Sequence, residues 1–121
     1  MVMDDFSKNI KPYIKIQLEA AHKARTDNDS SLEFRHLENA HVLGQASTYW
    51  HTLVHFKMLA WSVRNRVLRE FFGQIFRIIG AATKTAFGLI PEGNTGGANI
   101  SPFKSLPIPA EFAEIIQSAK K

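Results

Sequence analysis

Four side chains that can bind a metal ion or carry a proton lie within one short stretch, residues 38–55. Glu38 and His41 are three residues apart, and His51 and His55 are four apart. Side chains at these spacings share one face of a helix and can reach a single ion. Di-metal helical bundles use Glu-x-x-His, and two histidines four residues apart can hold one metal. The sequence therefore predicts a metal site formed by Glu38, His41, His51 and His55.

The helix that must carry the first two ligands is marked at both ends. Ser30 followed by Glu33 matches a capping box, which predicts that a helix starts at Ser30. Apolar residues then recur at helical spacing. Gly44 is predicted to be a left-handed C-cap. The helix would thus place His41 one turn before its end.

The connection to the next helix is very short. Only Gln45 and Ala46 separate Gly44 from Ser47, which is the expected N-cap of a helix from Thr48 to about Val63. So short a link makes the two helices antiparallel neighbours. This geometry brings the histidines on either side of the turn towards one another.

Two further helices are expected to support this pair. The first opens at Ser7, with Pro12 in its first turn, and ends in a polar turn at residues 26–29. The other runs from about Val67 to Gly88, and we expect its apolar side to face the core. That side carries Phe71, Phe72, Ile75, Phe76, Ile79, Ala82 and Phe87, and the opposite side carries Glu70, Gln74, Arg77, Ala81 and Lys84.

The composition changes from Pro91 onwards. Residues 91–108 are predicted to form a loop and an extended strap, and residues 109–119 a short C-terminal helix. Residues 1–6 are predicted to be a flexible N-terminus. The glycine-rich loop Gly93–Asn99 lacks the Gly-Lys-Ser/Thr of a phosphate-binding loop, and we hypothesise that it folds over the histidines. The fold class is thus all-α, a four-helix bundle of two antiparallel helical hairpins with an extended C-terminal strap and a short fifth helix, in one domain spanning residues 1–121.

Composition restricts the classes of function. The 121 residues contain no cysteine, so a metal would need histidine, carboxylate or carbonyl ligands. The formal charge of +4 is spread along the chain without the dense basic stripe of a nucleic-acid-binding protein. Arg77 and Lys84 oppose a membrane span over residues 71–90. No signal peptide is apparent, which favours the cytoplasm.

Three other features are weaker candidates for chemistry. Glu19 and His22 repeat the Glu-x-x-His spacing, with a solvated pair as the alternative. Glu70 is a further potential metal ligand, although it could instead pair with Arg66 or Arg69. No arrangement of residues typical of a catalytic centre is present, so the sequence favours a binding protein over an enzyme. A metal-dependent enzyme is a third, weaker alternative, in which the bound metal would supply the chemistry.

Several motifs together resemble one known family. They are residues 37–45 (LENAHVLGQ), 51–55 (HTLVH), 93–99 (GNTGGAN) and 106–109 (LPIP). The chain is similar over roughly residues 10–116 to domain-of-unknown-function family 3703, small bacterial helical proteins without an assigned activity. The resemblance implies an association with heavy-metal resistance and transport functions. The family pattern matches Glu38, His41, His51, His55, Glu70 and Gln74.

Two functions from different classes follow from these observations. The first is binding of a divalent transition metal, zinc or iron for preference, by Glu38, His41, His51, His55 and Glu70, in metal homeostasis or resistance. The alternative is a non-enzymatic module of tetratricopeptide-like helical hairpins that binds a protein partner or a second copy of itself. In that case the histidines would be structural.

Overall fold

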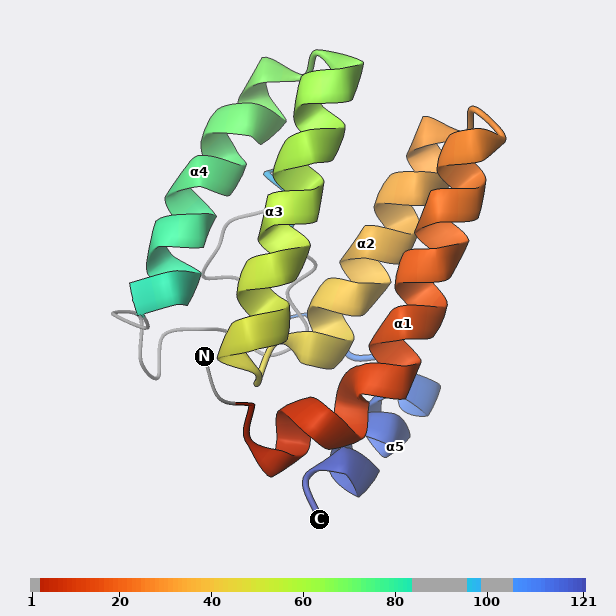
Figure 1. The fold of residues 1–121 in the computed structure, drawn as a ribbon, viewed down its shortest axis with the longest axis vertical. Helices are drawn as coiled ribbons and strands as arrows, with labels where there is room; N and C mark the ends of the chain where they lie inside the picture. The colour runs from red at the N-terminus through yellow and green to blue at the C-terminus, as the bar shows by residue number, and fades with distance from the viewer. Residues whose placement is uncertain (1–2, 84–95, 99–105) are drawn as a thin grey trace.

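The protein is a bundle of helices in the part of the chain that the structure describes. This computed structural model describes residues 3–83, 96–98 and 106–121, with only the backbone for residues 81–83. The helices are α1 (Asp5–Thr26), α2 (Ser30–Gly44), α3 (Thr48–Asn65), α4 (Leu68–Thr83) and α5 (Ala110–Ala119). Helices α1 and α2 form one hairpin, α3 and α4 form another, and α2 packs against α3 between them (Figure 1). The predicted all-α bundle with a short fifth helix is confirmed.

Helix α1 begins two residues before its predicted start at Ser7. The Asp4 carboxylate accepts a hydrogen bond from the Ser7 backbone N–H at 2.8 Å, which makes Asp4 the N-cap and Asp5 the first helical residue. Pro12 consequently lies beyond the first turn, inside the helix. Proline lacks the N–H for the intrahelical bond and commonly kinks a helix. Figure 1 shows the first turns of α1 bent away from the rest.

The predicted capping box at the start of α2 is wrong. The N-cap is Asp29, whose carboxylate accepts from the Leu32 N–H at 3.0 Å, and Ser30 is already helical. Glu33 does not reach back to the cap. Its carboxylate forms a two-pronged ion pair with the Arg64 guanidinium of α3, with N···O distances of 2.6 and 3.1 Å. The side chain thus ties α2 to α3.

The turn between α2 and α3 has the predicted length but not the predicted glycine conformation. Gly44 is not left-handed, and Gln45 after it is still right-handed at φ −58°. Glycine is required because a Cβ here would lie 2.8 Å from both Ile14 Cδ1 and Trp50 Cβ. Ser47 is the N-cap as predicted, and its Oγ accepts from the Trp50 N–H at 3.2 Å.

The end of α3 lies two residues after the predicted end at about Val63. The helix continues to Asn65, and Arg66 after it takes the left-handed conformation, at φ 56°. The Arg66 backbone N–H is directed at the carbonyls of Ser62 and Val63. This left-handed cap ends the helix and turns the chain into α4.

The apolar core lies between α1, α2 and α3, and α5 closes one end. Its most deeply buried apolar side chains are Ile10, Ile14, Ala40, Leu43, Val54 and Met58. The buried residues of α5, Phe112, Ile116 and Ala119, pack onto this core. Asn9 of α1 donates a hydrogen bond to the Ala119 carbonyl at 3.0 Å. Each fully buried aliphatic side chain contributes roughly 1.5–3 kcal/mol of stability.

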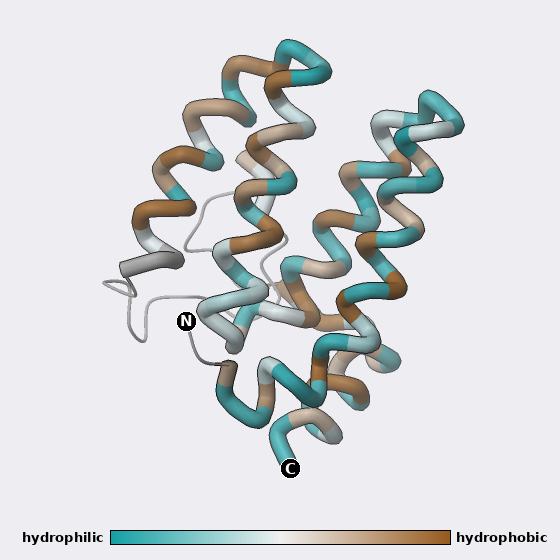
Figure 2. The backbone as a smooth tube through the Cα atoms, in the orientation of Figure 1, coloured by the Kyte–Doolittle hydropathy of each residue, from teal (hydrophilic) through white to brown (hydrophobic). Residues whose placement is uncertain are grey.

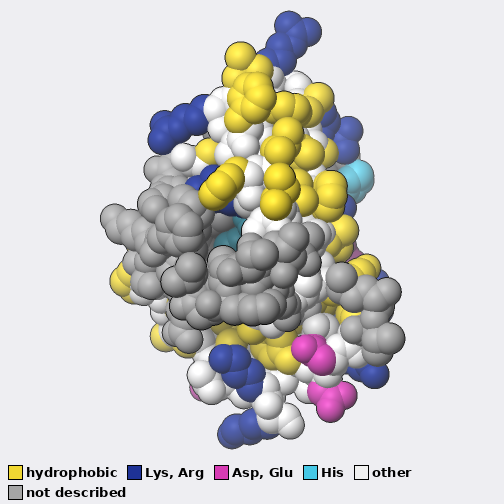
Figure 3. Space-filling view, turned by 90° about the vertical axis from the view of Figure 1, so that its left-hand side faces the viewer, with side chains coloured by type: hydrophobic (Ala, Val, Ile, Leu, Met, Phe, Trp, Pro, Cys, Tyr) yellow, Lys and Arg dark blue, Asp and Glu magenta, His cyan; other side chains and the backbone are white. Residues whose placement is uncertain are grey.

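Helix α4 faces the opposite way from the prediction. Phe72, Phe76 and Ile79 are 60–65% exposed, whereas Glu70 and Gln74 are 7% and 0% exposed. Figure 2 shows hydrophobic positions recurring along α4, and Figure 3 shows hydrophobic side chains gathered on the upper part of the α4 side of the molecule. The prediction that this apolar side faces the core is wrong. The polar side faces inwards because it meets buried polar groups of α3.

Parts of three predictions lie outside the described residues: the end of the fourth helix (residues 84–88), most of the glycine-rich loop and residues 99–105 of the C-terminal loop and strap. Among the helices that the structure describes, none combines the length and apolar character needed to cross a membrane.

Candidate metal centre

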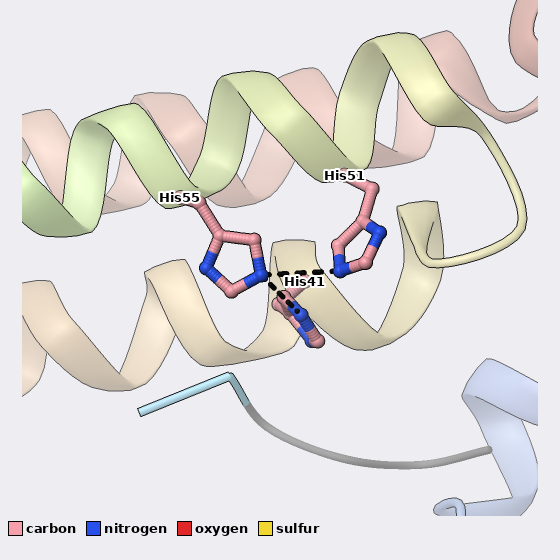
Figure 4. A group of neighbouring side chains, drawn as sticks. All are labelled: His41, His51 and His55. Atoms are coloured by element: carbon pink, nitrogen blue, oxygen red, sulfur yellow. Dashed lines mark hydrogen bonds between the residues drawn. The ribbon is translucent and has the colours of Figure 1, made fainter. Parts of the chain in front are cut away.

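Three buried histidines meet where α2 and α3 approach their connecting turn. His41 comes from the last turn of α2, and His51 and His55 come from the first two turns of α3. Their exposed fractions are 2%, 6% and 2%. Figure 4 shows the three rings pointing towards one another. The short Gly44–Ser47 connection produces this convergence, because it makes the two helices neighbours.

The same nitrogen of each ring points to a common centre. His55 Nε2 lies 3.1 Å from His41 Nε2 and 3.1 Å from His51 Nε2. Each ring offers a ligand nitrogen within 4.8 Å of the other two. Zinc binds imidazole nitrogen at about 2.0–2.1 Å, so two such ligands of a tetrahedral ion lie roughly 3.3 Å apart. The two separations that involve His55 are close to this value.

Gln74 of α4 determines which nitrogen of His55 carries the proton. Its Nε2 donates to Glu70 Oε2 at 2.5 Å and to the Gly96 carbonyl at 2.7 Å. Both of these partners only accept, so the amide oxygen Oε1 must be the atom that faces His55 Nδ1 at 2.6 Å. His55 Nδ1 is therefore the protonated nitrogen, and Nε2 presents a lone pair to the centre of the cluster.

This proton placement makes His55 Nε2 an acceptor that faces two other imidazole nitrogens. A neutral imidazole nitrogen has a single in-plane lone pair. His55 Nε2 can therefore accept one well-directed hydrogen bond, although His41 and His51 both place Nε2 at 3.1 Å from it. A positive ion at the common centre would satisfy all three nitrogens at once.

Burial keeps His55 in the neutral form that a metal requires. Burial, the neighbouring His51 and Arg77 together lower the pKa of His55 to about 3, although the hydrogen bond to Gln74 opposes the change. Burial also lowers the pKa of the Arg77 guanidinium, an effect that Glu70 opposes. At neutral pH the His55 ring does not have to lose a proton before it binds an ion.

A carboxylate and a short backbone segment lie behind the histidines. The Ala98 backbone N–H donates to both oxygens of Glu70, at 2.9 and 3.0 Å. Gly96 has φ +86°, in the left-handed region, and a Cβ there would lie 2.6–2.9 Å from atoms of the His41 ring. Residues Gly96–Ala98, hereafter the covering segment, thus pass directly over His41.

The predicted site residues divide into two groups. Among the described residues, His41, His51 and His55 form the one group of three or more potential ligands that the structure brings together. Glu38 is half-buried on α2 and outside this group. Glu70 is also outside the group, but it is linked to His55 through Gln74.

The second Glu-x-x-His pair of the sequence is not part of the site. Glu19 and His22 are exposed on α1 and do not belong to the cluster. The roles of Gln74 and Gly96 were not predicted from spacing. Two signals pointed to them, the family pattern for Gln74 and the hypothesis that the glycine-rich loop covers the histidines.

Comparison with known proteins gives one match. The model of a family described as a protein of unknown function, DUF3703, matches residues 8–116. No curated protein and no solved structure matches the chain.

Proposed function

Because the chain belongs to DUF3703, a family of proteins of unknown function, we propose a function from the geometry of its site: binding of a divalent transition metal ion by His41, His51 and His55. The observation that carries the proposal is the convergence of three buried Nε2 atoms, two of them 3.1 Å from the third. Three imidazole nitrogens directed at one point are what a shared ion needs.

The donor set favours zinc over iron. Three imidazole nitrogens suit zinc, whereas the common non-haem iron site uses two histidines and a carboxylate. The Glu70 carboxylate is engaged by the Ala98 N–H and the Gln74 amide. Glu70 and Gln74 therefore act as outer-shell groups that orient His55. Three protein ligands leave a fourth position of a tetrahedral ion for water or another small ligand.

We propose that this binding serves metal homeostasis, because the family resemblance implies an association with heavy-metal resistance and transport functions. One observation favours the alternative of an interaction module, namely the exposed apolar side chains of α4 (Figure 3). The two functions differ in what they require of the histidines. Only the first needs stoichiometric metal.

Elemental analysis of protein purified without a polyhistidine tag tests the proposal. We expect about one zinc ion per chain, and cobalt(II) substitution should give the visible absorption of a tetrahedral ion. A His51→Ala/His55→Ala variant should lose the metal. The matched control is His22→Ala/His36→Ala, which removes the two histidines outside the cluster and should retain it. Wild-type protein that contains no metal and whose thermal stability is unchanged by added zinc would refute the proposal and favour the interaction module.

A further inference from the structure

We propose that Glu70 and Gln74 are positioning residues that hold the covering segment over His41, so that the metal ion exchanges only when this segment is released. The inference rests on the proposed metal binding and adds a route by which the ion enters and leaves. It concerns residues that lie outside the ligand set. It also assigns a role to the short piece of the glycine-rich loop that the structure describes.

The covering segment lies against the ligand atom itself. A Cβ on Gly96 would be 2.6 Å from His41 Cδ2, 2.8 Å from Cγ and 2.9 Å from Nε2. Contacts below 3 Å cannot be accommodated without movement, so no other residue fits here without displacing the backbone or the ring. The positive φ of Gly96 also favours glycine. Gly96 and Gly97 are both buried, so the segment shields this side of His41 from solvent.

Three hydrogen bonds from α4 hold the segment in place. The Ala98 N–H donates to both Glu70 oxygens, and the Gly96 carbonyl accepts from Gln74 Nε2. Bonds to a buried carboxylate are stronger than those between neutral groups. Gly73 permits the close approach, because a Cβ there would lie 2.5 Å from Ala98 Cβ. Two successive turns of α4 therefore contact the covering segment closely, through Glu70, Gly73 and Gln74.

One side chain connects this attachment to the ligands. The Gln74 amide binds His55 Nδ1 through its oxygen, and Glu70 and Gly96 through its nitrogen. Release of the covering segment removes one of the two acceptors that orient this amide. Opening the segment therefore exposes His41 and loosens His55 in the same step, and both changes favour loss of the ion.

The rate at which zinc passes to a coloured chelator, followed by stopped-flow absorbance, tests the proposal. In Glu70→Gln, a donor NH₂ must replace one of the acceptor oxygens that serve the Ala98 N–H and the Gln74 amide. In Gly96→Ala, the new Cβ displaces the segment from His41. We expect zinc release to be at least about tenfold faster in both variants, which is the scale of outer-shell effects on metal sites. The matched controls are Glu114→Gln, at an exposed position of α5, and Gly80→Ala, where a Cβ meets nothing within 4 Å.

A second measurement is made on metal-free protein. Amide hydrogen exchange by NMR should show the Ala98 N–H protected in the wild type and at least tenfold less protected in Glu70→Gln. Unchanged zinc release in both variants, or an unprotected Ala98 amide in the wild type, would overturn the proposal while metal binding stands. Wild-type protein that binds no zinc would overturn the metal proposal and, with it, the claim about exchange.

Discussion

Replacement of Gln74 by leucine should destabilise the metal-free protein by about 3 kcal/mol. Gln74 is fully buried and makes hydrogen bonds at 2.5, 2.6 and 2.7 Å. Leucine nearly conserves the volume, so the loss comes from polar groups left without partners. The His55 Nδ1–H and the Gly96 carbonyl would each lose a partner, at roughly 1–3 kcal/mol apiece. Glu70 keeps its bonds to the Ala98 N–H and adds less to the total.

Urea unfolding of the metal-free variant, followed by circular dichroism, measures this loss. The control is Gln117→Leu at an exposed position of α5, which should change the free energy of unfolding by no more than about 0.5 kcal/mol. The variant should also bind zinc about 10–100-fold more weakly, because nothing then selects the His55 tautomer. A loss of stability below about 1 kcal/mol in Gln74→Leu would refute the assigned hydrogen-bond network.

Three further predictions concern the metal-free protein. The unfolded chain binds a proton at His55 below about pH 6.5, whereas the folded protein, with a pKa of about 3, does not. Stability is therefore full above pH 6.5 and should fall by about 1.4 kcal/mol per pH unit towards pH 3, a slope that urea unfolding of His55→Gln should lack. Glu33→Ala leaves Arg64 without its buried partner and should lose about 2–4 kcal/mol, whereas Asp27→Ala, in an exposed pair, should lose less than about 1 kcal/mol, both measured by chemical denaturation. Met58→Ala should lower the free energy of unfolding by about 2–5 kcal/mol, because its side chain is fully buried, and a loss under 1 kcal/mol in thermal unfolding would contradict the described packing.

The histidine cluster could be predicted from the sequence because its geometry is local. The spacing of His51 and His55 places them on one face of α3, and a turn of a few residues leaves α2 little choice of direction. The involvement of Glu38 was predicted by the same rule of spacing, yet it lies outside the group that the structure brings together. Spacing restricts a side chain to one side of a helix, but the choice among partners on that side depends on packing.

The orientation of α4 could not be predicted from periodicity. The rule that an apolar stripe faces the core assumes that the core offers apolar partners. Here the interior next to α4 contains His55, which needs a hydrogen-bond acceptor, so Gln74 and Glu70 are buried and Phe72 is exposed. The same kind of reason explains the wrong capping box, because Glu33 is engaged by a residue 31 positions away. Long-range polar partners are invisible to local patterns.

The order in which the chain is made bears on when the ion can bind. The proposed ligands His41 and His55 are separated by 14 positions, whereas Glu70 and Ala98 are separated by 28. Short loops close at a smaller entropic cost and sooner than long ones. A nascent chain that has reached the end of α3 therefore already carries all three imidazoles on one helical hairpin. An ion captured at that stage would be enclosed only later, when α4 and residues 96–98 arrive, so the supply of metal during synthesis would decide which ion the finished protein retains.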